Sequence, residues 1–132
     1  MKLIVNIDVP ELAPAIEFYT TALGLELSRI LDDDVVELIG ATATIYLLRN
    51  AAGTAFSEAC DDVRRYDKHW TPVHIDFVVD DIDAATERAV QAGAVRESEC
   101  VSWLGSKCVT LSDPFGNGFC LIEFSEKTYR NT

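Results

Sequence analysis

The sequence contains the same strand–helix pattern twice, and this internal repeat constrains the fold more than any other feature. Residues 3–25 run from an alternating segment, IVNIDV, through an amphipathic helix to Gly24. Residues 73–95 follow the same order, from HIDFVV through a second helix to Gly93. Period-two alternation is typical of a strand, and glycine often follows the last residue of a helix. The chain is therefore predicted to fold as two related modules.

Each module is expected to continue with three more strands, because short apolar segments separated by turn residues follow each helix. After the first helix these segments are 25–31, 35–39 and 42–48; after the second they are 94–102, 106–112 and 118–125. Both modules therefore have the predicted order βαβββ, which places the chain in the α+β class. We expect a single domain, 1–132, made of a first module at 1–49, a connector at 50–71 and a second module at 72–126.

The charge of the chain argues against nucleic acid as a partner. Its 132 residues include 22 acidic and 11 basic side chains, for a net charge of −11. Binding to phosphates depends on lysine and arginine, and the clustered basic side chains are Arg64, Arg65 and Lys68. An anionic small molecule would have to use that cluster. Because 48% of the residues are apolar, the chain can bury a core.

The amino-terminal apolar run is too short for a signal peptide, and Asp8 and Pro10 interrupt it. No segment approaches the roughly 18 apolar residues of a membrane span. We therefore expect a cytoplasmic protein with no membrane partner.

The four cysteines show no C-x-x-C spacing, which argues against a zinc knuckle or a thioredoxin motif. In a reducing compartment we expect them to be buried thiols. The alternative is an oxidised pair of Cys108 and Cys120, which lie on neighbouring predicted strands.

Several motifs recur in an order that covers nearly the whole chain: Phe18-Tyr19, Ala22-Leu23-Gly24-Leu25, HIDFVVDDID, Asp113-Pro114-Phe115-Gly116-Asn117 and Leu121-Ile122-Glu123-Phe124. Together they resemble the vicinal oxygen chelate superfamily, which includes glyoxalase I, extradiol dioxygenases, fosfomycin-resistance enzymes and bleomycin-resistance proteins. The resemblance implies two paired βαβββ modules that form a cup-shaped, incomplete barrel around a ligand or metal cavity. It also implies a homodimer, which would help to cover sheet edges.

Metal-using members of this superfamily take ligands from the first and last strands of their modules. His74 matches the first-strand position of the second module and Glu123 the last-strand position, so the resemblance implies a metal pair with Glu123 as the catalytic carboxylate. Imidazole and carboxylate suit a divalent Ni, Zn, Fe or Mn ion. The matching positions of the first module hold Ile4 and Tyr46, which are unsuitable or poor ligands. The four-ligand set therefore lacks half its members.

Side chains alternate along a strand, so a polar cavity lining is expected from Asn6, Asp8, His74, Asp76 and Glu123. A shifted third metal ligand could come from Asp8, Asp76 or Glu37. Without a metal, His74 and Glu123 could instead hydrogen-bond each other.

Four aromatic or basic side chains are further candidates for ligand binding, each with a structural alternative: Tyr46, His69, Trp70 and Trp103. Tyr46 could donate its hydroxyl group to a ligand or simply pack. His69 could be a general base and Trp70 a stacking surface, or they could be a surface histidine and an anchor for the connector. Trp103 could line the pocket or fill the second module.

Two hypotheses of function remain open. In the first, the chain is a lyase or dioxygenase-like enzyme whose metal chelates the oxygen atoms of a small molecule. In the second, it uses no cofactor and sequesters a small hydrophobic or aromatic compound. His74 and Glu123 favour the first hypothesis, and Ile4 favours the second.

Overall fold

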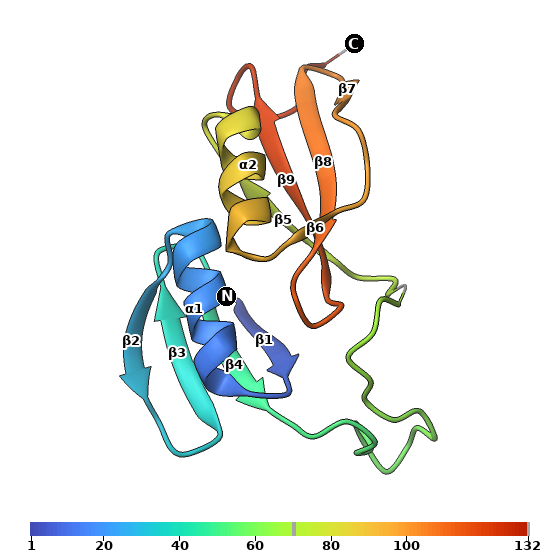
Figure 1. Ribbon diagram of the computed structural model, residues 1–132. Helices are drawn as coiled ribbons and strands as arrows, with labels where there is room; N and C mark the ends of the chain where they lie inside the picture. Colours follow the sequence, from blue (N-terminus) through green and yellow to red (C-terminus); the bar gives the residue numbers. More distant parts are fainter. Residues whose placement is uncertain (70, 132) are drawn as a thin grey trace. The chain divides into compact units, whose positions relative to one another are not determined.

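The computed structural model describes residues 1–69 and 71–131, and it confirms two βαβββ modules (Figure 1). The chain divides into two compact units, Met1–Asp67 and Lys68–Thr132. Most of the connector expected at 50–71 thus belongs to the first unit. Among the described residues, no helix is long and apolar enough to cross a membrane.

The first unit contains a four-stranded mixed sheet and one helix. Its elements are β1 (Ile4–Val9), α1 (Leu12–Leu23), β2 (Glu26–Ile30), β3 (Val35–Ile39) and β4 (Thr44–Arg49). The strand order is β1-β4-β3-β2. The pair β1–β4 is parallel, whereas the other two pairs are antiparallel. Gly24 directly follows α1, and its φ of 67° is left-handed and therefore favours glycine.

Alternation along these strands separates an apolar face from a polar one. The buried apolar side chains of the sheet share one face and form the core with α1: Ile7, Val9, Val36, Leu38, Ile45 and Leu47. The other face carries a row of polar side chains that crosses all four strands: Asn6, Tyr46, Glu37 and Arg29.

The second unit repeats this plan with one extra short strand. Its elements are β5 (Ile75–Val78), α2 (Ile82–Ala92), β6 (Val95–Arg96), β7 (Val101–Trp103), β8 (Ser106–Ser112) and β9 (Gly118–Phe124). The order is β5-β9-β8-β6, and β7 also pairs with β8. The strand expected at 94–102 is thus divided into β6 and β7, which pair with opposite ends of β8.

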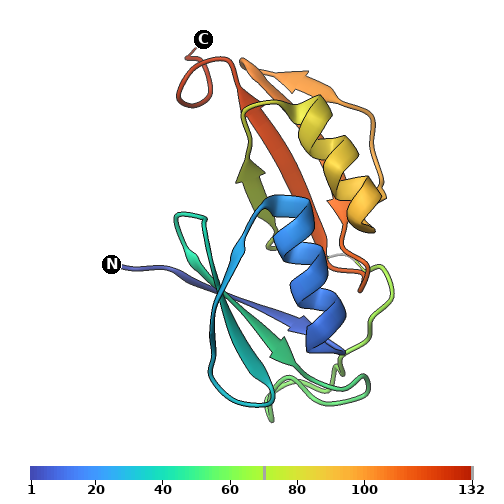
Figure 2. The same ribbon diagram turned by 60° about the vertical axis from the view of Figure 1, so that its left-hand side comes forward.

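In each unit the helix covers one face of the sheet (Figures 1 and 2). In the second unit, Val109, Leu111 and Leu121 are at most 2% exposed. They share a face with Phe119 across the β8–β9 pair, and this face packs on α2. The opposite face of the same strands carries the polar and sulfur-containing side chains considered next.

Candidate functional site

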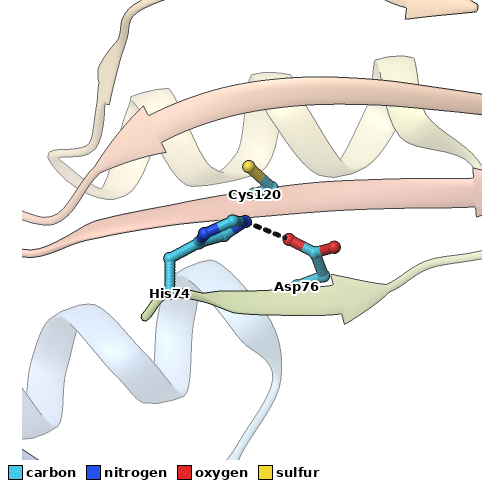
Figure 3. A group of neighbouring side chains, drawn as sticks. All are labelled: His74, Asp76 and Cys120. Carbon is cyan, nitrogen blue, oxygen red and sulfur yellow. Dashed lines mark ion pairs between the residues drawn. The ribbon is translucent and has the colours of Figure 1, made fainter. Parts of the chain in front are cut away.

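Three side chains of different chemistry meet on the open face of the second sheet. The His74 Nε2 atom lies 3.1 Å from the Asp76 Oδ1 atom. One ligand atom from each of His74, Asp76 and Cys120 lies within 4.8 Å of the others. Figure 3 shows the imidazole and the carboxylate turned toward each other, with the sulfur atom beside them. These residues provide nitrogen, oxygen and sulfur donors in one place.

The strand register explains why these three residues meet. Asp76 and Cys120 are direct partners in the parallel pair of β5 and β9, so their side chains leave the sheet on the same side. His74 precedes Asp76 by two residues and shares its face. The histidine and aspartate side chains are 46% and 39% exposed, whereas Cys120 is 8% exposed. The cluster is therefore open on one side and anchored in the sheet on the other.

A cavity of about 400 Å³ adjoins this cluster within the second unit. It is lined by Lys68, His69, Thr71, His74, Glu97, Thr110, Gly118, Phe119 and Cys120. The Lys68 Nζ atom forms an ion pair of 2.9 Å with the Glu97 Oε2 atom. A Cβ atom on Gly118 would lie 2.9 Å from Lys68 Nζ, so the glycine leaves room for this ammonium group. The cavity thus combines a cation, two imidazoles and a thiol.

The expected pairing of His74 with Glu123 is wrong. His74 directly precedes Ile75, which pairs with Phe119. Glu123 lies four positions beyond Phe119, and four positions correspond to roughly 13 Å along a strand. It also belongs to the opposite face of β9 from Cys120. Its Oε1 atom accepts a hydrogen bond of 3.1 Å from the backbone nitrogen of Ile82.

Glu123 therefore contacts the first residue of α2, where the helix dipole favours a negative charge. The Asp81 side chain accepts a second hydrogen bond in the same turn, from Ala84. Two carboxylates thus satisfy amino-terminal N–H groups of α2. Glu123 was expected to bind a metal and act in catalysis, whereas in the structure it caps the amino-terminal end of α2.

The alignment of the two last strands also needs correction. Asn6 pairs with Tyr46 in the first unit, and Asp76 pairs with Cys120 in the second. Tyr46 therefore corresponds to Cys120, three residues before Glu123. Sequence reasoning missed this cysteine because it treated all four thiols as packing residues.

Tyr46 belongs to a closed polar network in the first unit. Its hydroxyl group donates a 2.7 Å hydrogen bond to Glu37, and Arg29 donates two more to the same carboxylate. The bonds from Arg29 and then from Tyr46 lower the pKa of Glu37 to about 2. The hydrogen bond to Glu37 raises the pKa of Tyr46. Glu37, a candidate third metal ligand, is thus engaged by an arginine and a tyrosine.

The two remaining first-strand candidates differ in their surroundings. Asn6 is exposed beside Tyr46. The Asp8 carboxylate accepts 2.7 Å and 2.9 Å hydrogen bonds from Arg64 Nε and Asn50 Nδ2. Asp8 therefore attaches the segment after β4 to the end of β1.

The aromatic candidates do not gather in one place. His69 lines the cavity beside His74. Trp103 is 61% exposed, packs edge-on against Tyr129 and, together with Glu123, lines a different cavity of about 320 Å³. Trp70 lies outside the described residues.

All four thiols are free, with no disulfide. Cys60 and Cys100 are exposed, which corrects the expectation that all the cysteines are buried. Cys108 is half-buried and Cys120 buried. Burial, and then the proximity of Cys120, raise the pKa of the Cys108 thiol to about 12.

The donor set of His74, Asp76 and Cys120 fits a divalent transition metal. Zinc binds imidazole, carboxylate and thiolate at about 2.0–2.3 Å, which places its donors within about 4 Å of one another. The observed 4.8 Å limit is close to that spacing. Small rotations of the exposed His74 and Asp76 side chains would therefore suffice to bring the donors together.

Comparison with known proteins agrees with this architecture. The sequence model of a glyoxalase-like domain matches residues 4–122. No curated protein matches the chain. Hypothetical protein SA1046 from S. aureus has 21% identity and a TM-score of 0.74, with 93% of each chain covered.

Two other solved structures share the fold. A glyoxalase/bleomycin resistance protein/dioxygenase family enzyme from Burkholderia phytofirmans PsJN has 18% identity and a TM-score of 0.70, with 92% of this chain and 96% of that chain covered. The fosfomycin resistance protein FosX from Listeria monocytogenes has 17% identity and a TM-score of 0.71, with 95% and 93% covered. At such low identity these matches concern the fold alone. The match over residues 4–122 assigns the chain to the glyoxalase-like domain family of the vicinal oxygen chelate superfamily.

Proposed function

We propose that this protein binds a divalent metal ion through His74, Asp76 and Cys120 and acts on a small oxygen-bearing molecule in the adjoining cavity. The observation that carries the proposal is the convergence of three different donor atoms within 4.8 Å. Two of the donors, His74 and Cys120, line a cavity of about 400 Å³, which is within the usual size range of small-molecule sites.

Each donor has a reason to hold a metal. Imidazole and carboxylate suit Ni, Zn, Fe or Mn, and a cysteine thiolate adds preference for the softer of these ions. When bound, such an ion polarises a carbonyl oxygen or lowers the pKa of a coordinated water. The 3.1 Å contact between His74 Nε2 and Asp76 Oδ1 holds these two donor atoms side by side, so an ion could take the place of their mutual contact.

The cavity side chains would bind and orient the substrate. The Lys68 ammonium group can pair with an anionic or carbonyl oxygen if that oxygen competes with Glu97. His69 lines the same cavity, and an imidazole placed beside a substrate can serve as the general base that is expected at this residue. These groups support a lyase-type reaction at a carbon beside an oxygen. The names of the structural neighbours also permit a dioxygenase-like reaction.

The alternative function is the metal-free binding of a small hydrophobic or aromatic compound. One observation favours it: the 3.1 Å contact between His74 and Asp76 satisfies both side chains without an ion. In that case the cavity would hold the compound, and His74 would contribute a hydrogen bond rather than a coordination bond.

Elemental mass spectrometry of the untagged protein separates the two functions. We expect near-stoichiometric zinc, nickel, iron or manganese in the wild type and its loss in His74→Ala. His69→Ala is the matched control, because it removes the other histidine from the same cavity without touching the three donors. Absence of metal after incubation of the wild type with each ion would contradict the proposal and favour metal-free binding.

The homodimer expected from the resemblance stays a prediction. Analytical ultracentrifugation at micromolar concentration tests it, and a monomer there would contradict it.

A further inference from the structure

We propose that a second cavity of this unit, of about 320 Å³, binds a small aromatic carboxylate. Arg130 and Trp103 both line this cavity; the guanidinium group pairs with the carboxylate, and the indole packs on the aromatic ring. Glu123 in this cavity and Cys120 in the metal cluster lie on opposite faces of β9. The site is therefore separate from the metal cluster and goes beyond the proposed function.

The turn between β7 and β8 forms one wall of the cavity. Trp103 pairs with Ser106, so Leu104 and Gly105 are the two loop residues. Their φ angles are 47° and 76°, and two positive φ angles are typical of a type I′ hairpin turn. Among residues 1–69 and 71–131, Leu104 is the one non-glycine residue with a positive φ. Such backbone conformations persist where neighbouring structure holds them, and they occur often at ligand sites.

The segment after β9 is the neighbouring structure that holds this turn. The backbone nitrogen of Ser125 donates a 2.8 Å hydrogen bond to the Gly105 oxygen, and that of Arg130 donates one of 2.8 Å to the Leu104 oxygen. Both carbonyl groups of the turn are thus satisfied by the same segment. These bonds fix the backbone of Arg130 at the cavity.

The side chains of Ser125 and Arg130 lie directly over Gly105. A Cβ atom at Gly105 would lie 2.9 Å from Ser125 Oγ, 2.9 Å from Arg130 Cγ and 3.0 Å from Arg130 Nε. A hydroxyl group and a guanidinium nitrogen therefore adjoin the same point above the turn. Together they provide two donors for the oxygen atoms of a carboxylate, which binds arginine well because the planar guanidinium group matches its geometry.

The charges around the cavity favour a single carboxylate. Within the described parts of the chain, no carboxylate forms an ion pair with Arg130. Lys107 also lines the cavity, and its ammonium nitrogen lies 3.8 Å from Glu123 Oε2. The Glu123 carboxylate is part of the lining and repels a dianion such as phosphate more strongly than a monoanion.

Trp103 gives the site its preference for an aromatic ligand. The residue is 61% exposed, although one edge contact, with a centroid distance of 5.2 Å, joins its ring to Tyr129. Tyr129 in turn contacts Phe124 at 4.9 Å, so the indole is supported by two further rings. An exposed indole can pack against a planar ligand. A cavity of about 320 Å³ is at the lower end of the range for small-molecule sites, which suits one ring with one carboxylate.

NMR titration of the ¹⁵N-labelled full chain with benzoate tests the proposal, with benzamide as the neutral probe of the same shape. We expect benzoate to shift the Trp103 indole and Gly105 amide signals. Arg130→Gln should weaken benzoate binding by about tenfold or more, because it removes the charged donor. Lys127→Gln is the matched control, since it removes an exposed cation of the same segment and should bind benzoate as the wild type does. Trp103→Leu identifies the indole signal and should also weaken binding.

Several outcomes would overturn the inference. Equal weakening in Arg130→Gln and Lys127→Gln would show a general effect of charge. Equal binding of benzamide would exclude recognition of the carboxylate, and equal binding of inorganic phosphate would exclude the aromatic class. Shifts confined to Thr110 and Gly118 would place the probe in the other cavity. The amide spectrum of each variant without ligand establishes that it is folded, and Arg130→Lys replaces Arg130→Gln if the glutamine variant is unfolded.

Discussion

Asp76 and Cys120 are direct partners across the parallel strands β5 and β9, and their side chains leave the sheet on the same face. The backbone fixes the positions of the two Cβ atoms in such a pair, so the carboxylate and the thiol stay neighbours while their side chains rotate. This fixed pair differs from a chance meeting of long surface side chains, because neither residue can move away without disturbing the sheet. The pair is therefore a rigid base on which His74 adds a third donor.

Replacement of Asp76 by asparagine should weaken zinc binding by at least about tenfold, because it removes a charged ligand and even the loss of an outer-shell partner typically costs about 10–100-fold in metal affinity. Competition with a chromogenic zinc chelator measures the change. Glu87→Gln, which neutralises an exposed carboxylate on α2, is the matched control and should bind zinc as the wild type does. A zinc affinity of Asp76→Asn equal to that of Glu87→Gln and the wild type would exclude Asp76 from the site.

Glu123 should affect stability rather than metal binding. Glu123→Ala removes a carboxylate that accepts a hydrogen bond from the first residue of α2, and we expect a loss of about 1–2 kcal/mol in the free energy of unfolding. Urea denaturation measures this loss, and zinc affinity should stay unchanged.

Lys107→Ala provides the comparison for Glu123→Ala. The Lys107 ammonium nitrogen lies 3.8 Å from Glu123 Oε2, and the Lys107 side chain is 54% exposed. Loss of this ion pair should therefore lower the free energy of unfolding by less than about 1 kcal/mol. Lost zinc binding with unchanged stability in Glu123→Ala would instead restore the metal pair of His74 and Glu123.

The order of strands and helices could be predicted because its signals are local. Alternation, a glycine after each helix and turn residues between strands need no knowledge of distant contacts. The strand expected at 94–102 was divided into β6 and β7 because residues there pair with two separate parts of β8, which is a long-range property.

The site could be predicted only in part, for a reason visible in β9. Phe119, Cys120, Leu121 and Ile122 are all buried, so the strand shows no alternation from which its two faces could be told apart. Glu123 was therefore assigned to the wrong face, and Cys120 was read as packing. His74 and Asp76 lie on β5 or just before it, where one face is more exposed, and their shared face was predicted correctly.

Asp8 should hold the segment after β4 rather than bind a ligand. It accepts hydrogen bonds from Arg64 and Asn50. The side chains of Arg64 and Asp8, which form an ion pair, are only 16% and 26% exposed. Asp8→Ala should therefore free this segment and increase its cleavage by trypsin about 5–30-fold, the factor that corresponds to 1–2 kcal/mol of local stability.

Limited proteolysis followed by mass spectrometry of the fragments measures that cleavage. Asp33→Ala, at an exposed turn between β2 and β3, is the control and should leave the rate unchanged. An unchanged rate in Asp8→Ala would show that Asp8 does not restrain the segment.

Glu37 should make the first unit sensitive to acid. Its pKa is lowered from 4.5 to about 2 by hydrogen bonds from Arg29 and Tyr46. Between these two pH values the unfolded chain binds a proton at Glu37 that the folded chain does not, so stability falls as the pH falls through this window. In Glu37→Gln, this contribution is absent, and the variant should be less stable at pH 7 but lose less stability on acidification. Chemical denaturation of both proteins at pH 7, 4.5 and 3 measures the difference, and parallel stability curves would contradict the role given to this network.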